Sequence, residues 1–395
     1  MSNKVHFNGR PVWAEIKLGA LAHNLRAIHQ HMARTRKSAG AGETTPKILA
    51  VVKANAYGHG AVPVARALAK AGAEWFGVTC AAEGIELRDH GIRKPILLLT
   101  GFWEGEEKAL IKHGLTPAVT RSEQLWLLER AAAKSRKPLS FHAKIDTGMN
   151  RLGISPSDVE LFAKTLASCA HLRLQGIFTH FASSEEFTHD QTERQRQLFE
   201  ATLGRLRELK IGAPMIHLAN SAAIVSRPET WSTMVRPGLV LYGHHQRYEP
   251  SHLDAEAAKT LRLQPVLSLR ARIISLRDLN PGQGVGYNSR WKASRPSKVA
   301  VMAMGYADGL PRALTNKGRV IVRGQFAPLV GTVSMDLSAV DVTDVPDVRM
   351  GDVVTVYGSD GSASQQVADV AKLLGTVTSD LCCALGQRVP RFYLS

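Results

Sequence analysis

The first part of the chain alternates short apolar runs with segments of helical periodicity. Eight runs have the length and composition of buried strands: residues 48–53, 75–79, 96–100, 115–119, 140–145, 174–179, 215–218 and 234–236. Helical spacing lies between them, most clearly at residues 18–34, 61–71, 123–133, 158–170 and 190–209. Strands that are apolar on both faces and separated by helices are typical of a buried parallel sheet. With a span of about 240 residues, the pattern predicts an α/β fold, a (β/α)8 TIM barrel, with an open doubly wound sheet as the alternative.

The pattern changes near Leu261. Strand-like runs broken by glycine-containing turns follow: "PVLSLRARIISL", "SKVAVMAMGY", "GRVIVRGQFAPLVGTV" and "GDVVTVYG". Helical spacing returns only at residues 364–374. We therefore expect a barrel over residues 13–250, followed by a C-terminal all-β domain over residues 256–395. The alternating run at residues 12–17 makes residues 1–17 a candidate source of one more strand for that domain.

Composition narrows the classes of function. The chain has 395 residues, 21% of them charged, and a formal net charge of +16, which would permit nucleic-acid binding. The basic residues are scattered, however, and the clusters at 34–37 and 134–137 contain no aromatic residues, so we expect a solvated surface and no nucleic-acid partner. The four cysteines lack metal-ligand spacing, so we expect no metal site and a reducing compartment. No secretory leader or long apolar segment is recognisable, so we expect a cytoplasmic protein without membrane contact.

Polar side chains collect where the predicted strands end, which is where TIM barrels carry their chemistry. Such residues lie at or just after the ends of the first, fifth, sixth, seventh and eighth strands: Lys53, Lys144, Asp146, Arg151, His180, Asn220, Ser221, Arg236 and Gly238. A backbone N–H and a hydroxyl after the last two strands suit a phosphate group. A lysine facing such a site indicates pyridoxal phosphate (PLP), whose ring nitrogen takes an Asp or Arg partner. Arg236 is the candidate for that partner.

Nine motifs together resemble the alanine racemase family of fold-type III PLP enzymes. They are "AVVKANAYGHG", "KIDTGMNRLG", "THFASSE", "HLANSAA", "VRPGLVLYG", "GYNSRW", "GYADGLPR", "VSMD" and "RVPR". The resemblance runs from about residue 12 to residue 391 and implies interconversion of L-alanine and D-alanine. It also implies a homodimer whose active sites are shared between the subunits.

The resemblance implies a role for each matching position. Lys53 carries the cofactor, and Arg236 bonds its pyridine nitrogen. The other positions that match cofactor contacts are Tyr57, Arg151, His180, Asn220, Ser221, Gly238 and Leu239. Lys144 matches a lysine that is often carbamylated and orients Arg151, which also lies near the substrate. Met335 and Tyr306 match substrate contacts at the site entrance and, with Tyr287, come from the second subunit.

Racemisation needs one base on each face of the α-carbon, and the resemblance assigns these roles to Lys53 and Tyr287. An arginine at the pyridine nitrogen, unlike an aspartate, does not stabilise ring protonation, and this should disfavour transamination. Plainer interpretations stay open for four positions: Asp146 and Asn220 as turn or cap residues, His180 as a core histidine, and Tyr287 as a β-turn aromatic.

The sequence departs from the family pattern at Gln387, where many relatives have a phosphate-binding tyrosine, and at Ser334, where many have cysteine. A broad-specificity or serine racemase would share every catalytic residue and remains the alternative. A related decarboxylase and a non-catalytic single-barrel PLP protein are the other rivals. The sequence does not separate a biosynthetic from a catabolic role.

Overall fold

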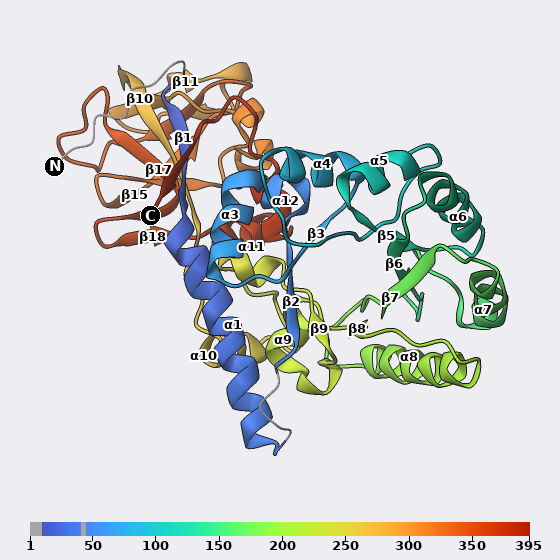
Figure 1. Ribbon diagram of the computed structural model, residues 1–395. Helices are drawn as coiled ribbons and strands as arrows, with labels where there is room; N and C mark the ends of the chain where they lie inside the picture. The colour runs from blue at the N-terminus through green and yellow to red at the C-terminus, as the bar shows by residue number, and fades with distance from the viewer. Residues whose placement is uncertain (1–9, 41–44) are drawn as a thin grey trace. The chain divides into compact units, whose positions relative to one another are not determined.

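The computed structural model describes residues 10–40 and 45–395 and divides the chain into two compact units (Figure 1). The barrel unit comprises residues 20–56 and 61–264. The β unit comprises Pro265–Ser395 with Tyr57–Gly60 and the N-terminal residues up to Gly19, of which 1–9 lie outside the described residues. Within the described ranges, no helix has both the length and the apolar character needed to span a membrane.

Eight parallel strands form the barrel unit's sheet, in the spatial order β8-β7-β6-β5-β4-β3-β2-β9. They are β2 (Lys47–Val51), β3 (Trp75–Val78), β4 (Ile96–Leu98), β5 (Thr116–Val119), β6 (Leu139–Lys144), β7 (Leu172–Phe178), β8 (Met215–His217) and β9 (Met234–Val235). Thr233 N donates to Ile216 O at 3.1 Å and Arg236 N to Ala219 O at 2.9 Å, so β9 and β8 nearly close the sheet. The predicted TIM barrel is confirmed, and the open doubly wound sheet is excluded.

Helices cover the outside of these strands (Figure 1). They are α1 (Leu18–Ser38), α3 (Ala61–Ala71), α4 (Ala81–Asp89), α5 (Glu107–His113), α6 (Glu123–Ser135), α7 (Val159–Ala167), α8 (Gln191–Glu208), α9 (Ser221–Ser226) and α10 (Leu253–Thr260). Helix α3 buries residues 61, 64, 65 and 68, which is the i, i+3, i+4, i+7 spacing of a one-sided helix.

In β6, Phe141 packs on Phe162 of α7 at 6.5 Å between ring centroids, so the alternate residue His142 points into the barrel.

The β unit is built on a nine-stranded sheet, in the order β18-β17-β14-β15-β16-β13-β10-β1-β19. Its strands are β1 (Val12–Lys17), β10 (Leu267–Leu279), β13 (Ser297–Met302), β14 (Arg319–Val322), β15 (Gln325–Val330), β16 (Ser338–Asp341), β17 (Val353–Asp360), β18 (Ala363–Gln365) and β19 (Arg391–Leu394). Strand β1 runs antiparallel to β10 and parallel to β19. Two helices, α11 (Val367–Leu374) and α12 (Thr378–Cys383), belong to this unit, and sequence periodicity indicated only the first.

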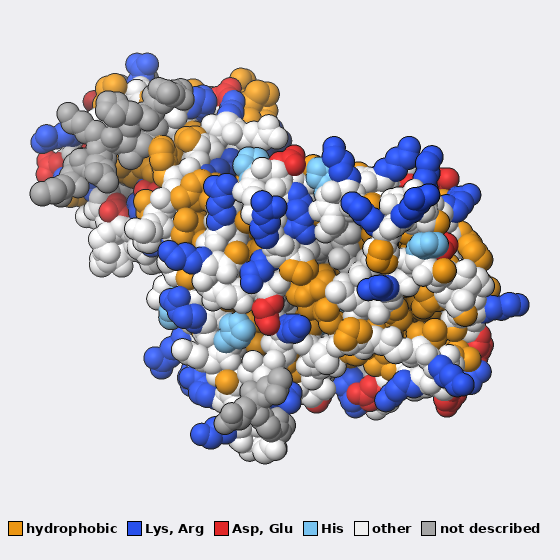
Figure 2. Space-filling view, in the orientation of Figure 1, with side chains coloured by type: hydrophobic (Ala, Val, Ile, Leu, Met, Phe, Trp, Pro, Cys, Tyr) orange, Lys and Arg blue, Asp and Glu red, His pale blue; other side chains and the backbone are white. Residues whose placement is uncertain are grey.

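Charged side chains are distributed over the surface. Figure 2 shows Lys and Arg scattered across the face in view, with acidic and neutral side chains between them. This distribution agrees with the solvated basic surface expected from the sequence.

The first barrel strand ends earlier than predicted. Strand β2 stops at Val51, and Lys53–Tyr57 form a single turn (α2) in which residues 54 to 57 all have φ between 52° and 53°. This is left-handed helical backbone, which costs an L-residue roughly 1–2 kcal/mol. The apolar pattern of the sequence carries no sign of this reversal, because alanine and asparagine at these positions are compatible with ordinary helix or strand.

The glycines that follow the turn are required by close packing inside the β unit. Gly58 has φ +78°, and a Cβ there would lie 2.0 Å from the carbonyl oxygen of Cys382. Gly60 has φ +99°, and a Cβ there would lie 1.9 Å from the hydroxyl of Tyr393. Arg391 Nε donates to the Gly58 carbonyl at 3.2 Å, which fixes this segment.

We expect Gly58→Ala to lower the stability of the protein by about 1–3 kcal/mol more than Gly91→Ala, because the added methyl group overpacks against backbone. Gly91 has a similar φ of +85° but open space around its Cα, so it isolates the steric part of the effect. Urea unfolding midpoints of the two variants would be compared. Equal losses would contradict the packing argument.

Candidate active site

Cationic side chains converge at the carboxyl ends of the barrel strands. The pKa of Lys144 is lowered to about 8, because the side chain is buried and because Arg236, Arg151 and Lys53 are electrostatic neighbours, while Asp146 acts in the opposite direction. Three other predicted site residues, which include two from other strand ends, therefore lie within electrostatic range of Lys144.

The guanidinium of Arg236 is buried at the centre of this group. It donates to three main-chain carbonyls: Thr179 O at 2.6 Å, His217 O at 2.7 Å and Leu218 O at 2.9 Å. It also lies 3.2 Å from Nδ1 of His180. Among the described residues no carboxylate pairs with it, and burial lowers its pKa to about 9. A buried cation without a carboxylate partner is costly, and a bound anion would reduce that cost.

A chain of two histidines runs from Arg236 into the barrel, and sequence reasoning did not identify it. Arg236 Nη1 lies 3.1 Å from His217 Nδ1, and His217 Nε2 lies 2.9 Å from His142 Nδ1. A guanidinium can only donate, so His217 Nδ1 accepts and His217 Nε2–H donates to His142. Both rings are therefore neutral. Burial and Arg236 lower the pKa of His142 to about 3 and that of His217 well below its usual value.

His180 lies on the other side of Arg236. Burial, and after it the positive charge of Arg236, holds the pKa of His180 well below its ordinary value. Since Nδ1 accepts from Arg236, the ring is neutral. The plainer interpretation, a core histidine, accounts for this contact, because Nδ1 is satisfied by a buried donor.

The residues after the last two strands also meet. Gly238 N donates to Ser221 Oγ at 2.9 Å, which places a hydroxyl and a backbone amide side by side. Leu239 follows Gly238 and begins a short 3-10 helix (Leu239–Tyr242). Asn220 is the N-cap of α9: its Oδ1 accepts from Ala223 N at 3.1 Å and from Ser184 Oγ at 2.8 Å. The interpretation of Asn220 as a cap residue therefore accounts for its side-chain oxygen.

Asp146 organises the loop after β6. Its Oδ1 accepts from the main-chain N–H groups of residues 148, 149 and 150, each at 3.0 Å, and its Oδ2 accepts from Arg151 N at 3.1 Å. These four bonds show that Asp146 shapes a turn, and its negative charge also raises the pKa of Lys144. The side chain of Arg151 is exposed in the isolated chain.

The remaining predicted residues meet in the β unit. Tyr287, Tyr306 and Met335 line a cleft of about 350 Å³ and are 71%, 43% and 52% exposed. Ser334 Oγ donates to Leu337 O at 2.7 Å and so closes the loop that presents Met335. Arg388, from the "RVPR" motif, bonds both Asp308 and Asp336 at 2.7 Å, which anchors the same loop.

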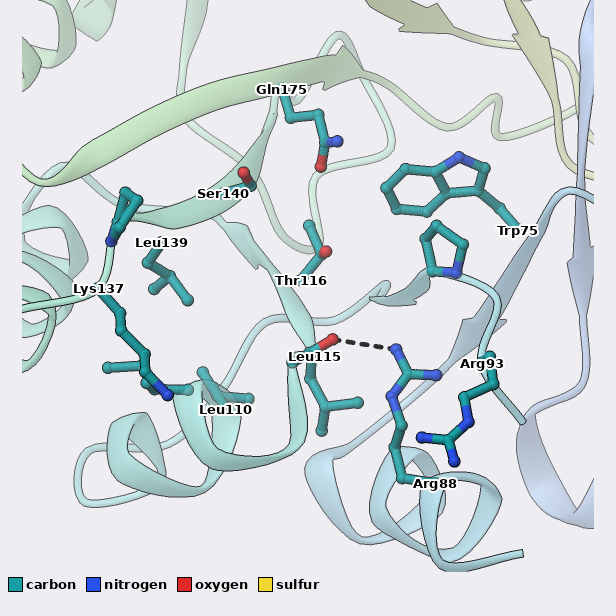
Figure 3. Close-up of a pocket in the computed structure, with 14 residues that line it drawn as sticks. Trp75, Arg88, Arg93, Leu110, Leu115, Thr116, Lys137, Leu139, Ser140 and Gln175 are labelled. Atoms are coloured by element: carbon teal, nitrogen blue, oxygen red, sulfur yellow. Dashed lines mark hydrogen bonds between the residues drawn. The ribbon is translucent and has the colours of Figure 1, made fainter. Parts of the chain in front are cut away.

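A different cavity lies at the amino-terminal mouth of the barrel (Figure 3). Its volume is about 400 Å³, and residues at strand starts, such as Trp75 and Thr116, line it. Arg88 points toward it, but its guanidinium already donates to four carbonyls, including Gly114 O at 3.0 Å. This end of a TIM barrel usually serves stability, and we do not place the active site there.

Comparison with known proteins decides the family. Residues 16–246 match the family model "Alanine racemase, N-terminal domain", and residues 266–393 match "Alanine racemase, C-terminal domain". The chain belongs to the alanine racemase family. The resemblance inferred from the nine motifs is thus confirmed.

Individual alanine racemases are similar over nearly the full length. Those of Geobacter sulfurreducens and Halothermothrix orenii are 39% and 38% identical, with 98% and 97% of each chain covered. The solved biosynthetic alanine racemase of Pseudomonas aeruginosa is 36% identical, with a TM-score of 0.83 and coverage of 98% of this chain and 100% of that one. The Bacillus anthracis alanine racemase with bound L-Ala-P is 30% identical, with a TM-score of 0.88 and coverage of 99% and 96%.

The pKa of Lys144 predicts a pH-dependent stability in cofactor-free protein and carbon-dioxide-free buffer. Between about pH 8 and the ordinary value of 10.5, the unfolded chain holds the Lys144 proton and the folded chain does not. Stability should therefore rise with pH in this window, and wild type should gain relative to Lys144→Met between pH 7 and pH 9.5. Urea midpoints would measure the difference, with the exposed Lys164→Met as control. A pH-independent difference would contradict the lowered pKa.

Proposed function

We propose that this protein is a PLP-dependent alanine racemase that interconverts L-alanine and D-alanine. The observation that carries the proposal is the full-length similarity to alanine racemases, which extends over both units. The cationic barrel mouth supports it, because it supplies the charge that an anionic cofactor needs. A few cysteines that form no disulfide among the described residues suit a cytoplasmic enzyme.

The residues at the barrel mouth fit PLP. Ser221 Oγ and Gly238 N, which lie 2.9 Å from each other, would hold the phosphate together with Leu239 N and Tyr57. Arg236 would bond the pyridine nitrogen, since its position is fixed by three carbonyls. His180 would pack on the ring. Arg151 would lie near the phenolic oxygen, with Lys144 orienting it.

Carbamylation of Lys144 is part of this proposal. Its lowered pKa leaves a larger neutral amine fraction than in an ordinary lysine, and only a neutral amine adds carbon dioxide. The resulting carbamate would place a negative charge beside Arg151. A labelled-carbonate resonance that is lost in Lys144→Ala would detect it, and no such resonance would count against it.

When bound, PLP stabilises the negative charge that develops on the α-carbon as the proton leaves. This chain supplies the two proton carriers. Lys53 Nζ takes or returns the proton on one face of the α-carbon, and Tyr287 Oη does so on the opposite face. Arg236 stays protonated at neutral pH even with its pKa lowered to about 9, so it would donate a hydrogen bond to the pyridine nitrogen and keep the proton. Met335 would contact the substrate carboxylate through its main chain, and Tyr306 would limit the entrance.

We infer that the enzyme is a homodimer in which Tyr287, Tyr306 and Met335 serve the partner's barrel. Three large side chains exposed together on one cleft are unusual for a monomer and mark an interaction site. A proton carrier 71% exposed to water would also be poorly placed for catalysis. A partner surface would cover it.

The first experiment incubates purified, PLP-loaded protein with L-alanine in D₂O and follows both enantiomers by chiral chromatography with mass detection. We expect D-alanine carrying deuterium at the α-carbon. Lys53→Ala should lose essentially all activity, and Tyr287→Phe about 10²–10⁴-fold, since a general acid–base group is removed. Turnover of serine, lysine or arginine in place of alanine would indicate the broad-specificity alternative. Carbon dioxide release would indicate a decarboxylase, and no exchange would refute the two-base mechanism.

Mixing two inactive variants tests the shared site. In a mixed dimer of Lys53→Ala and Tyr287→Phe, one site has both defects and the other has none. Co-refolding equal amounts should therefore restore about a quarter of wild-type activity. If each site lay within one chain, every site would keep one defect and activity would not return. Each variant refolded alone is the control.

A further inference from the structure

The turn that begins at Lys53 has a strained backbone, which contacts from outside the turn must stabilise. Residues 54 to 57 are left-handed, and an isolated L-peptide would leave this conformation. Ala54 and Asn55 are exposed in the isolated chain, so packing does not confine them. Ala56 is fully buried, so it is the exposed part of the turn, next to Lys53, that depends on hydrogen bonds.

Glu83 makes that contact. Its Oε1 accepts the N–H of Ala54 at 2.7 Å, and its Oε2 accepts the N–H of Thr79 at 2.7 Å. The Ala54 amide belongs to the peptide group that begins at the carbonyl of Lys53. The carboxylate therefore ties the backbone of Lys53 to the end of the neighbouring strand β3.

Helix capping alone does not explain this arrangement. Glu83 is the third residue of α4, a position where a glutamate ordinarily accepts the N–H of the N-cap residue. The N-cap of α4 is Cys80, but the oxygen of Glu83 accepts the N–H of Thr79, one residue earlier. One oxygen at Thr79 is enough to support the start of the helix. The second oxygen reaches a segment 29 residues earlier, which has no part in that helix.

Two other bonds of the turn lie further from the lysine. Asn55 Oδ1 accepts Ala61 N at 2.7 Å, and Ala56 N donates to Val52 O at 2.9 Å. They close the turn and start α3, but neither involves the Lys53–Ala54 peptide group. Glu83 holds that group at its N–H.

We propose that Glu83 is a positioning residue for Lys53. By fixing the Lys53–Ala54 peptide group in a strained turn, its carboxylate limits the excursion of the lysine amine both when it carries the cofactor and when it moves a proton. Such restraint keeps the reacting groups in productive geometry. This inference rests on the proposed function of Lys53.

The test compares Glu83→Gln with wild type. Glutamine still starts a helix well, but one of the two carboxylate oxygens becomes an NH2 donor, so one of the two backbone N–H groups loses its acceptor. Glu86→Gln, an exposed position in the same helix, is the matched control. The first readout is hydrogen exchange of cofactor-free protein over residues 53–57, which should be about tenfold faster or more in Glu83→Gln and unchanged in Glu86→Gln.

Two further readouts connect the contact to Lys53. Titration with PLP, followed by the visible absorption of lysine-linked cofactor, should show a smaller linked fraction at saturation in Glu83→Gln. With alanine, kcat should fall about 10- to 100-fold while KM changes little, because positioning and not substrate binding is impaired.

Three results would overturn the proposal. One is unchanged exchange in Glu83→Gln, and another is faster exchange with normal linkage and kcat. If Glu83→Gln does not fold, site-resolved exchange of wild type decides: an Ala54 amide as unprotected as a free one refutes the contact, and a protected one supports it. Wild type that never links PLP would instead refute the proposed function, whatever the exchange data show, so the two failures are distinguishable.

Discussion

A guanidinium buried without a carboxylate partner is the constraint around which the candidate active site is arranged. Arg236 satisfies its donors with carbonyls of Thr179, His217 and Leu218, which lie just beyond or at the ends of two adjacent strands. Because it can only donate, it fixes the tautomer of His217 and, through it, that of His142. The histidines remain neutral, so the positive charge stays uncompensated. That residual charge favours the binding of an anion at this end of the barrel.

Lys53 is restrained in a different way from Arg236. Hydrogen bonds from its guanidinium fix the side chain of Arg236. In the proposed function the amine of Lys53 must move between the cofactor and a proton, so the restraint on Lys53 has to act through its backbone. The left-handed turn provides it, with Glu83 bonded to the Ala54 amide. The two glycines beyond it then enter close contacts that no side chain would tolerate. The strained turn after Lys53 is thus stabilised by the hydrogen bond to Glu83 at its start and by the tight packing of Gly58 and Gly60 at its end.

Much of this could be predicted from the sequence, because periodicity and strand-end position are local properties. The eight strand positions, the barrel and the family resemblance were correct, and strand ends erred by only one or two residues. Other features could not be predicted. His142 and His217 look like ordinary strand residues, and only barrel closure brings them into line with Arg236. Helix α12 is short and has little periodicity. Glu83 resembles any first-turn glutamate until its second oxygen is seen at Ala54.

The sequence by itself determined the fold class, the family and the kinds of side chain available at each strand end, since these depend on composition and spacing along one chain. Only the tertiary structure decided which of those side chains act together. Hydrogen bonds from Arg236 to His217 and from Ala54 to Glu83 join residues 19 and 29 positions apart. Whether a donor finds its acceptor over such separations depends on how strands and helices pack, and the protonation states and backbone strain of the candidate site follow from that packing.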